Sequence, residues 1–216
     1  MKNIFFQILC LTTVILFFKN LEDLFISLNF SWTFSKITPY FLLIILGFTL
    51  MFKIRRLLII KIPFIRLIAL ILIFIFPFGL GFALNPIYEG DFSKNGKEIK
   101  NEQTLSDFQK FDFVVLTIPD CPYCHETINS INLLQKRNPN LTIKYIVCSS
   151  ENRQIEPYRF KLNSKIQVSL AQNLSKMIEI ANGSFPFFVK LNQDGIYTWS
   201  NNEFGVRAKD FLESEL

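Results

Sequence analysis

Two cysteines separated by two residues, Cys121 and Cys124, are the side chains whose spacing points most directly to chemistry. They lie in the stretch TIPDCPYCHETI, residues 117–128, directly after an apolar run. Such a pair can be a redox-active dithiol, because one thiolate attacks a disulfide and the second resolves the mixed disulfide. With His125, the only histidine, the same letters also form C-x-x-C-H, the sequence that attaches a c-type haem.

The residues around the dithiol predict how its thiols are tuned. Pro122 suits the first position of a helix, which places Cys121 at the positive end of the helix dipole, where a thiolate is favoured. Asp120 opposes the thiolate, whereas a protonated His125 four residues after Cys121 favours it. The opposing contributions are similar, so the sequence predicts neither the pKa of Cys121 nor the direction of electron flow.

Three other interpretations compete with redox chemistry. Haem attachment needs a distal ligand, and Met177 is the only methionine outside the membrane half. A zinc site needs Cys121, Cys124, Cys148 and a fourth ligand, but neighbouring residues such as Cys124 and His125 seldom both reach one tetrahedral ion. The pair could also be a structural disulfide in an interaction module, although so short a loop constrains the unfolded chain little. The sequence favours a redox dithiol.

The elements that hold the dithiol follow a βαβ pattern. FDFVVLTI (111–118) is a β-branched apolar run typical of a strand covered on both faces. Ile128, Ile131 and Leu134 then share one side of a helix, and LTIKYIVC (141–148) predicts a second strand. Two strands joined by one helix make a parallel pair with a right-handed crossover.

The rest of the soluble part predicts further elements. Residues 149–183 are mixed, with a helix around 173–181, and FPFFVKL and IYTWS flank a hairpin turn at Asp194-Gly195. A C-terminal amphipathic helix is indicated by the spacing of Phe204, Ala208, Phe211 and Leu212. We therefore expect an α/β domain with a mixed central sheet and flanking helices.

Strand, C-P-Y-C, helix, strand and SFPFFVKLNQDG together resemble the thioredoxin superfamily over residues 108–216. Cys-Pro-Tyr-Cys is the tetrapeptide typical of glutaredoxins, and FPFFVKLNQDG resembles the cis-proline segment of membrane-anchored thioredoxin-like proteins. The resemblance implies that Cys121 is the nucleophile and Cys124 the resolving cysteine. It also implies that Pro122, Tyr123, Phe185 and the cis-proline Pro186 bind an extended protein substrate.

Departures from the family pattern refine these expectations. Asp120 stands where thioredoxins have Trp, and Val115 stands about where they carry a buried acid. The lysine with which glutaredoxins hold glutathione is missing, so we expect no glutathione and no other cofactor. The stretch from Cys121 to Pro186 is longer than in a minimal thioredoxin. We therefore expect an insertion within 149–180, as in the membrane-anchored relatives.

The first 84 residues predict a membrane region. Half of the 216 residues are hydrophobic, and three uncharged stretches, about 3–18, 37–52 and 67–84, gather many of them. At about 1.5 Å per helical residue the stretches are about 24–27 Å long, close to the ~30 Å hydrocarbon core of a bilayer. We expect three transmembrane helices, a linker at 85–107 and a thioredoxin-like domain at 108–216.

Charge orients the spans. Lys53, Arg55, Arg56, Lys61 and Arg66 follow the second span with no acid among them, which indicates a cytoplasmic loop at 53–66. The N-terminus is then cytoplasmic and the C-terminal domain extracytoplasmic. Residues 1–84 carry eight basic and two acidic residues, against fifteen and sixteen in the remainder, so the overall charge of +5 reflects topology and excludes nucleic acid as a partner.

The expected partners are protein thiols and disulfides, membrane lipid and a separate membrane redox protein. A dithiol relay across the bilayer needs paired intramembrane cysteines, and Cys10 is the only cysteine in the membrane region.

Overall fold

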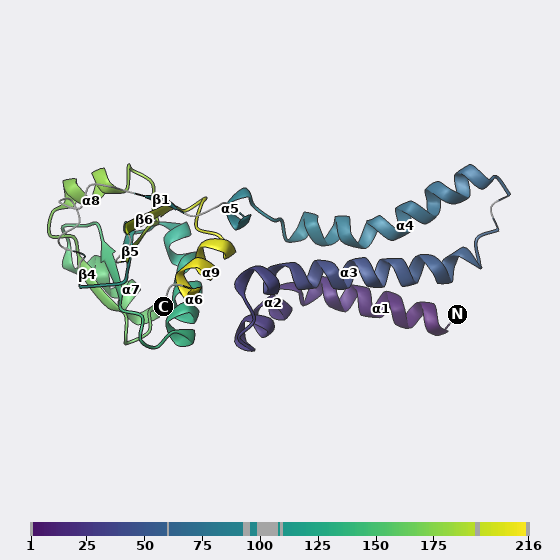
Figure 1. The fold of residues 1–216 in the computed structure, drawn as a ribbon, viewed down its shortest axis with the longest axis horizontal. Helices are drawn as coiled ribbons and strands as arrows, with labels where there is room; N and C mark the ends of the chain where they lie inside the picture. The colour runs from purple at the N-terminus through teal and green to yellow at the C-terminus, as the bar shows by residue number, and fades with distance from the viewer. Residues whose placement is uncertain are drawn as a thin grey trace. The chain divides into compact units, whose positions relative to one another are not determined.

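The computed structural model describes residues 2–59, 61–92, 96–98, 108, 110–192 and 195–214. Asp194 of the expected hairpin turn and much of the expected linker lie outside these residues. The chain divides into two compact units, Met1–Ile87 and Tyr88–Leu216, which are described separately below (Figure 1).

The first unit is helical. Two of its helices are long and apolar enough to cross a membrane: α3 (Trp32–Arg55) and α4 (Pro63–Leu84). At 24 and 22 residues they extend about 36 and 33 Å, more than the ~30 Å hydrocarbon core. Each contains the stretch that the sequence predicts as a span, extended at the N-terminal side.

Glycines let α3 and α4 pack closely. A Cβ added at Gly47 would lie 2.7 Å from the backbone oxygen of Phe74, and one added at Gly81 would collide with Leu43. At Gly79 the same addition meets nothing within 4 Å. Small residues at Gly47 and Gly81 therefore mark the packed side of the helix pair, as is usual between transmembrane helices.

The first predicted span, 3–18, differs in the structure. Helix α1 (Lys2–Leu16) is followed by α2 (Phe18–Ser27), and the two are bent by 70°. They count as a third span only if the bent pair is taken together. The reason is compositional, because α2 carries Lys19, Glu22 and Asp23 and cannot continue an apolar helix through hydrocarbon.

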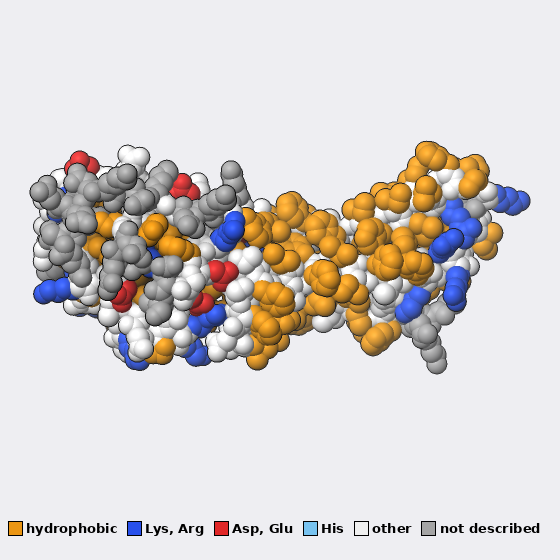
Figure 2. Space-filling view, viewed as in Figure 1, with side chains coloured by type: hydrophobic (Ala, Val, Ile, Leu, Met, Phe, Trp, Pro, Cys, Tyr) orange, Lys and Arg blue, Asp and Glu red, His pale blue; other side chains and the backbone are white. Residues whose placement is uncertain are grey.

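Polar contacts attach the bent pair to α3. The side-chain amide of Gln7 donates to the Leu46 carbonyl at 3.2 Å and to the Thr49 hydroxyl. Lys36 lies 3.8 Å from Glu22, which connects α2 to α3. Hydrophobic side chains nevertheless cover most of the visible surface of this unit, and Lys and Arg gather around the turn between α3 and α4 (Figure 2).

The second unit is built on one mixed sheet. Its six strands lie in the order β1-β6-β5-β2-β3-β4. The strands are β1 (Lys97–Glu98), β2 (Phe113–Thr117), β3 (Ile143–Val147), β4 (Gln167–Leu170), β5 (Phe187–Asn192) and β6 (Gly195–Ser200). Strands β2, β3 and β4 are parallel, whereas β5, β6 and β1 pair in antiparallel fashion.

Helices lie before, between and after these strands in the described part of the chain. They are α5 (Glu89–Phe92), α6 (Pro122–Arg137), η2 (Asn152–Ile155), α7 (Glu156–Lys161), α8 (Leu174–Ile180) and α9 (Val206–Ser214). Ile128, Ile131 and Leu134 of α6 are buried, as their spacing predicts. The parallel pairing of β2 and β3 around α6 is also confirmed.

The register assigns the helices to two faces of the sheet. Val114, Leu116 and Ile146 share a core cluster with Met177 of α8, so α8 covers that face. On the other face, Tyr145 donates a hydrogen bond to α6 and Lys190 lies over the Phe211 ring of α9. These two helices cover the same face, because Tyr145 and Phe188 both pair with Val115 and Phe188 precedes Lys190 by two residues.

Two features of this unit differ from the sequence-based expectation. Strand β4 was not anticipated within the expected 149–180 insertion, because QVSL is a short edge strand whose residues are only partly buried. The stretch expected as a linker contains α5 and β1, and β1 pairs with β6 at the other edge. Edge strands of two to four residues leave too weak a pattern to detect.

Candidate redox site

The dithiol lies where the central strand β2 gives way to helix α6. Strand β2 ends at Thr117, and the turn contains Asp120 in the left-handed region, with φ of 54°. Aspartate tolerates this conformation better than most residues. Cys121 is the N-cap of α6 and Pro122 follows within its first turn, as predicted.

The two cysteines form a disulfide, with Cα atoms 5.2 Å apart. The Cys121 sulfur also accepts a hydrogen bond from the backbone N–H of Cys124 at 3.2 Å. Cys121 retains 7% of its exposure and Cys124 none, while Pro122 and Tyr123 are exposed between them. Within the pair, Cys121 is therefore the more accessible residue, and its sulfur lies at the positive end of the α6 dipole, where it accepts a backbone N–H.

The Phe185–Pro186 peptide bond is cis, as the sequence resemblance implies. Pro186 immediately precedes β5, whose first residue, Phe187, pairs with Leu116 near the end of β2. Pro186 is buried, and Phe185 packs against the core cluster on the α8 face. Pro186 therefore lies beside the end of β2, the strand that leads into the dithiol segment.

Two buried tyrosines beside the dithiol were missed by sequence reasoning. The Tyr145 hydroxyl donates to the Cys124 carbonyl at 3.0 Å, and the Tyr158 hydroxyl donates to the Ile118 carbonyl at 2.7 Å. Thr117 donates to the Tyr158 hydroxyl at 3.2 Å, and the two tyrosine rings lie 5.4 Å apart. Neither tyrosine is close to the dithiol in sequence, so spacing gives no signal.

His125 stacks on Tyr158, with ring centroids 4.9 Å apart and planes within 11°. Its Nδ1 is buried and has no hydrogen-bond partner within the described part of the chain. The backbone N–H of His125 donates to the Cys121 carbonyl, as the α-helix requires. The ring is thus held by its stacking on Tyr158 of α7.

Burial raises the pKa of both tyrosine hydroxyls. For Tyr145, desolvation dominates and takes the pKa far above its usual value near 10. For Tyr158, desolvation is again the largest cause, and the negative charge of Asp120 adds to it. Both hydroxyls therefore stay protonated at neutral pH and remain hydrogen-bond donors.

Residues invoked by the metal and haem alternatives lie elsewhere. Cys148 is buried at the end of β3 in the core of the α8 face, and its backbone N–H donates to Thr117. Burial raises the pKa of its thiol to about 11. Met177 packs in the same core, whereas the dithiol helix α6 covers the opposite face. Cys148 is therefore a small packed residue of the core.

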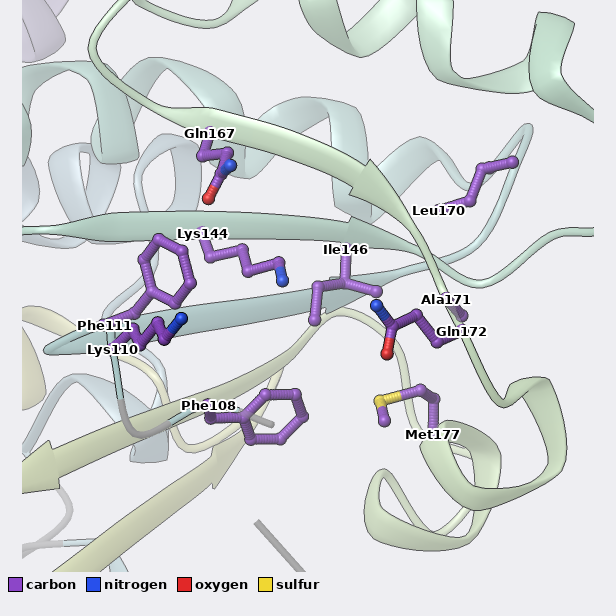
Figure 3. Close-up of a pocket in the computed structure, with 10 residues that line it drawn as sticks. All are labelled: Phe108, Lys110, Phe111, Lys144, Ile146, Gln167, Leu170, Ala171, Gln172 and Met177. Atoms are coloured by element: carbon purple, nitrogen blue, oxygen red, sulfur yellow. The ribbon is translucent and has the colours of Figure 1, made fainter. Parts of the chain in front are cut away.

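One cavity of this unit lies beside the dithiol turn. It measures about 340 Å³ and is lined by Pro119, Asp120, His125, Arg153, Gln154, Pro157 and Tyr158. A larger cavity, about 430 Å³, lies on the α8 face, with Lys110, Phe111 and Lys144 together on one side and Met177 on another (Figure 3). None of its lining residues belongs to the 117–125 segment, so cavity size alone does not locate the chemistry.

The chain was compared with protein families, curated proteins and solved structures. No family model and no curated protein matches the sequence. Among solved structures, a secreted Mycobacterium tuberculosis disulfide oxidoreductase homologous to E. coli DsbE shares 21% identity over 48% of this chain and 77% of its own, with a TM-score of 0.38. A thioredoxin-like protein from Bacteroides caccae shares 14% over 85% and 83%, with a TM-score of 0.37.

Because both TM-scores are low, the fold assignment rests on the chain itself. Strand β2 is followed by C-P-Y-C at the N-terminus of α6. The neighbouring antiparallel strand β5 begins directly after a cis-proline. Helices cover both faces of the mixed sheet. The second unit of this chain has a thioredoxin-like α/β fold with a cysteine pair at disulfide distance.

Proposed function

We propose that the chain is a membrane-anchored thiol–disulfide oxidoreductase that exchanges disulfides with extracytoplasmic protein substrates through Cys121 and Cys124. The observation that carries the proposal is the asymmetry of the pair. Cys121 caps the helix and keeps some exposure, whereas Cys124 is fully buried one turn later. Thiol exchange needs this division between an attacking and a resolving sulfur.

The exchange proceeds in two steps. In the reduced protein, the Cys121 thiolate attacks a substrate disulfide, forms a mixed disulfide and releases one substrate thiolate. The Cys124 thiolate then attacks the Cys121 sulfur and releases the second substrate thiolate. The substrate gains two electrons and the protein is left with the Cys121–Cys124 disulfide, which is the state described here. The reverse sequence oxidises a substrate dithiol.

Substrate binding is assigned to the two exposed residues between the cysteines and to the backbone of the cis-proline segment. Pro122 and Tyr123 lie between the cysteines, and Tyr123 is 59% exposed. Phe185 and Pro186 directly precede β5 and complete the proposed surface. Their backbone would pair with an extended substrate segment.

The basic turn between α3 and α4 supports the membrane orientation. With residues 53–66 on the cytoplasmic side, α4 alone brings the second unit to the outer side. The placement of the dithiol therefore does not depend on whether α1 and α2 together form a third span. If they do, the N-terminus is cytoplasmic. Membrane-impermeant maleimide should label Lys161→Cys in intact cells, and Lys61→Cys only after lysis.

The first unit serves as an anchor and docking surface for a separate membrane redox protein. Cys10 is its only cysteine, so this unit has no dithiol to relay electrons within the chain. The dithiol is then recharged by a partner. The isolated first unit keeping Cys121–Cys124 reduced in cells without another protein would contradict this.

A redox titration of the full chain in detergent tests the proposal. Thiols are alkylated at each potential and read by intact mass. We expect one two-electron transition that disappears in Cys124→Ser. A midpoint near about −270 mV indicates a reductant, and one between about −120 and −180 mV an oxidase or isomerase. Cysteines that never titrate would contradict the exchange mechanism and indicate a structural disulfide.

A further inference from the structure

The dithiol segment is held at both ends by buried tyrosine hydroxyls. One bond ends on the Ile118 carbonyl, three residues before Cys121, and the other on the carbonyl of Cys124 itself. The donors come from separate elements, since Tyr158 lies in α7 and Tyr145 in β3. The two bonds thus bracket the turn and first helical residues that carry both sulfurs.

Both donors are held in place by their own surroundings. Tyr158 is 1% exposed, stacks on His125 and accepts a hydrogen bond from Thr117 at the end of β2. Tyr145 is fully buried and sits on the central strand β3, which pairs with β2. Donors fixed in this way restrict their acceptors, because the bonds lie in a buried, low-dielectric site.

The restricted backbone favours the disulfide over the dithiol. Closing a disulfide requires the two sulfurs to meet, and the entropy lost in that step is smaller when the backbone already holds them close. In the reduced state a looser segment lets the thiols separate, which stabilises the dithiol. Any restraint on the segment therefore shifts the equilibrium of the two-electron reduction toward the disulfide.

Resting on the proposed function, we infer that Tyr145 and Tyr158 are positioning residues that set the redox equilibrium of the Cys121–Cys124 pair. Neither touches a reacting sulfur in the hydrogen bonds described, and each acts through a backbone carbonyl. This gives the inserted α7 helix a role in the chemistry, because it supplies Tyr158.

The test compares full-length Tyr145→Phe and Tyr158→Phe with the wild-type chain in the same redox titration. Phenylalanine removes only the hydroxyl and keeps each ring, including the stacking of residue 158 on His125. We expect each variant to raise the equilibrium constant for reduction by about threefold to tenfold, where tenfold corresponds to about 30 mV for two electrons. The midpoint becomes less negative.

Tyr197→Phe is the matched control. Tyr197 lies on β6 of the same sheet and packs against Phe211 and Trp199, and no hydrogen bond of its hydroxyl is seen in the described ranges. The midpoint potential of Tyr197→Phe should equal that of the wild type. A thermal melt of each variant, read by circular dichroism, separates lost stability from a shifted equilibrium, since a purely structural role lowers the melting temperature without moving the midpoint.

The outcomes are distinct. Midpoints of Tyr145→Phe and Tyr158→Phe that stay within twofold of wild type in equilibrium constant overturn the inference while the exchange function stands. A wild-type chain without a two-electron transition overturns both. If either variant fails to fold, Thr117→Val, which removes the donor to Tyr158, takes its place with the same expected direction.

Discussion

Phenylalanine plays opposite roles in the two units. Phe76 in α4 is 67% exposed, and so are many apolar side chains of α1, α3 and α4. Phe188 in β5 is fully buried and stacks with Phe113 and Phe204. A helix in lipid satisfies its own backbone and can turn apolar side chains outward, whereas a sheet in water must turn them inward. The outward phenylalanines of the first unit are thus what the proposed membrane anchor requires.

The proposed redox chemistry depends on the second unit alone, and removing its attacking sulfur should have the largest effect. Cys121→Ser should abolish reduction of a fluorogenic peptide disulfide by the full chain, because Cys124 is buried and cannot replace the attacking sulfur. Cys10→Ser, a change in α1, should leave the rate unchanged. If Cys121→Ser reduced the peptide faster than a free thiol does, the assignment of the attacking sulfur to the second unit would be contradicted.

Packing in the aqueous core predicts the next effect. Phe188→Ala should lower the free energy of unfolding of the second unit by about 3–5 kcal/mol, since it leaves a cavity beside the rings of Phe113 and Phe204. Urea unfolding followed by Trp199 fluorescence, in a Trp32→Phe background, measures it. Phe76→Ala should change this value by less than about 0.5 kcal/mol. Equal effects would contradict the division of the chain into two units with separate cores.

Close helix packing in the first unit predicts a smaller effect. Gly47→Leu should destabilise the α3–α4 pair by about 1–3 kcal/mol, because its Cβ would meet the Phe74 backbone. Gly79→Leu is the control, since open space surrounds that position. Titration with SDS in mixed micelles, followed by Trp32 fluorescence, compares them. A Gly79→Leu chain less stable than Gly47→Leu would reverse the assignment of the packed side.

Buried titratable groups of the second unit predict a gradual alkaline effect. Folding raises the pKa of Cys148 from near 9 to about 11, so the unfolded chain loses this proton first. Stability is therefore complete below about pH 9 and declines as the pH rises toward 11. Tyr145 and Tyr158 act in the same direction above about pH 10. Urea midpoints from pH 8 to 11 should fall, less steeply in Cys148→Ala.

Local patterns made part of this structure predictable. The apolar runs around 37–52 and 67–84 and the strands around 111–118 and 141–148 all lie within or overlap observed elements. Pro122 after Cys121 located the start of α6, and the resemblance of FPFF to a family segment located the cis-proline before β5. Each signal depends on a few consecutive residues, which is why it survives without knowledge of the fold.

Long-range contacts decided the rest. Tyr158 reaches Ile118 across forty positions and Tyr145 reaches Cys124 across twenty-one, so neither residue is marked by its neighbours. Strand β4 exists because β3 offers it an edge, and α1 meets α3 through Gln7. The sequence by itself determined the dithiol, its helix and the apolar spans, because spacing along the chain encodes them. Only the tertiary structure decided which buried hydroxyls hold the dithiol, because hydrogen bonding between distant elements depends on how they pack.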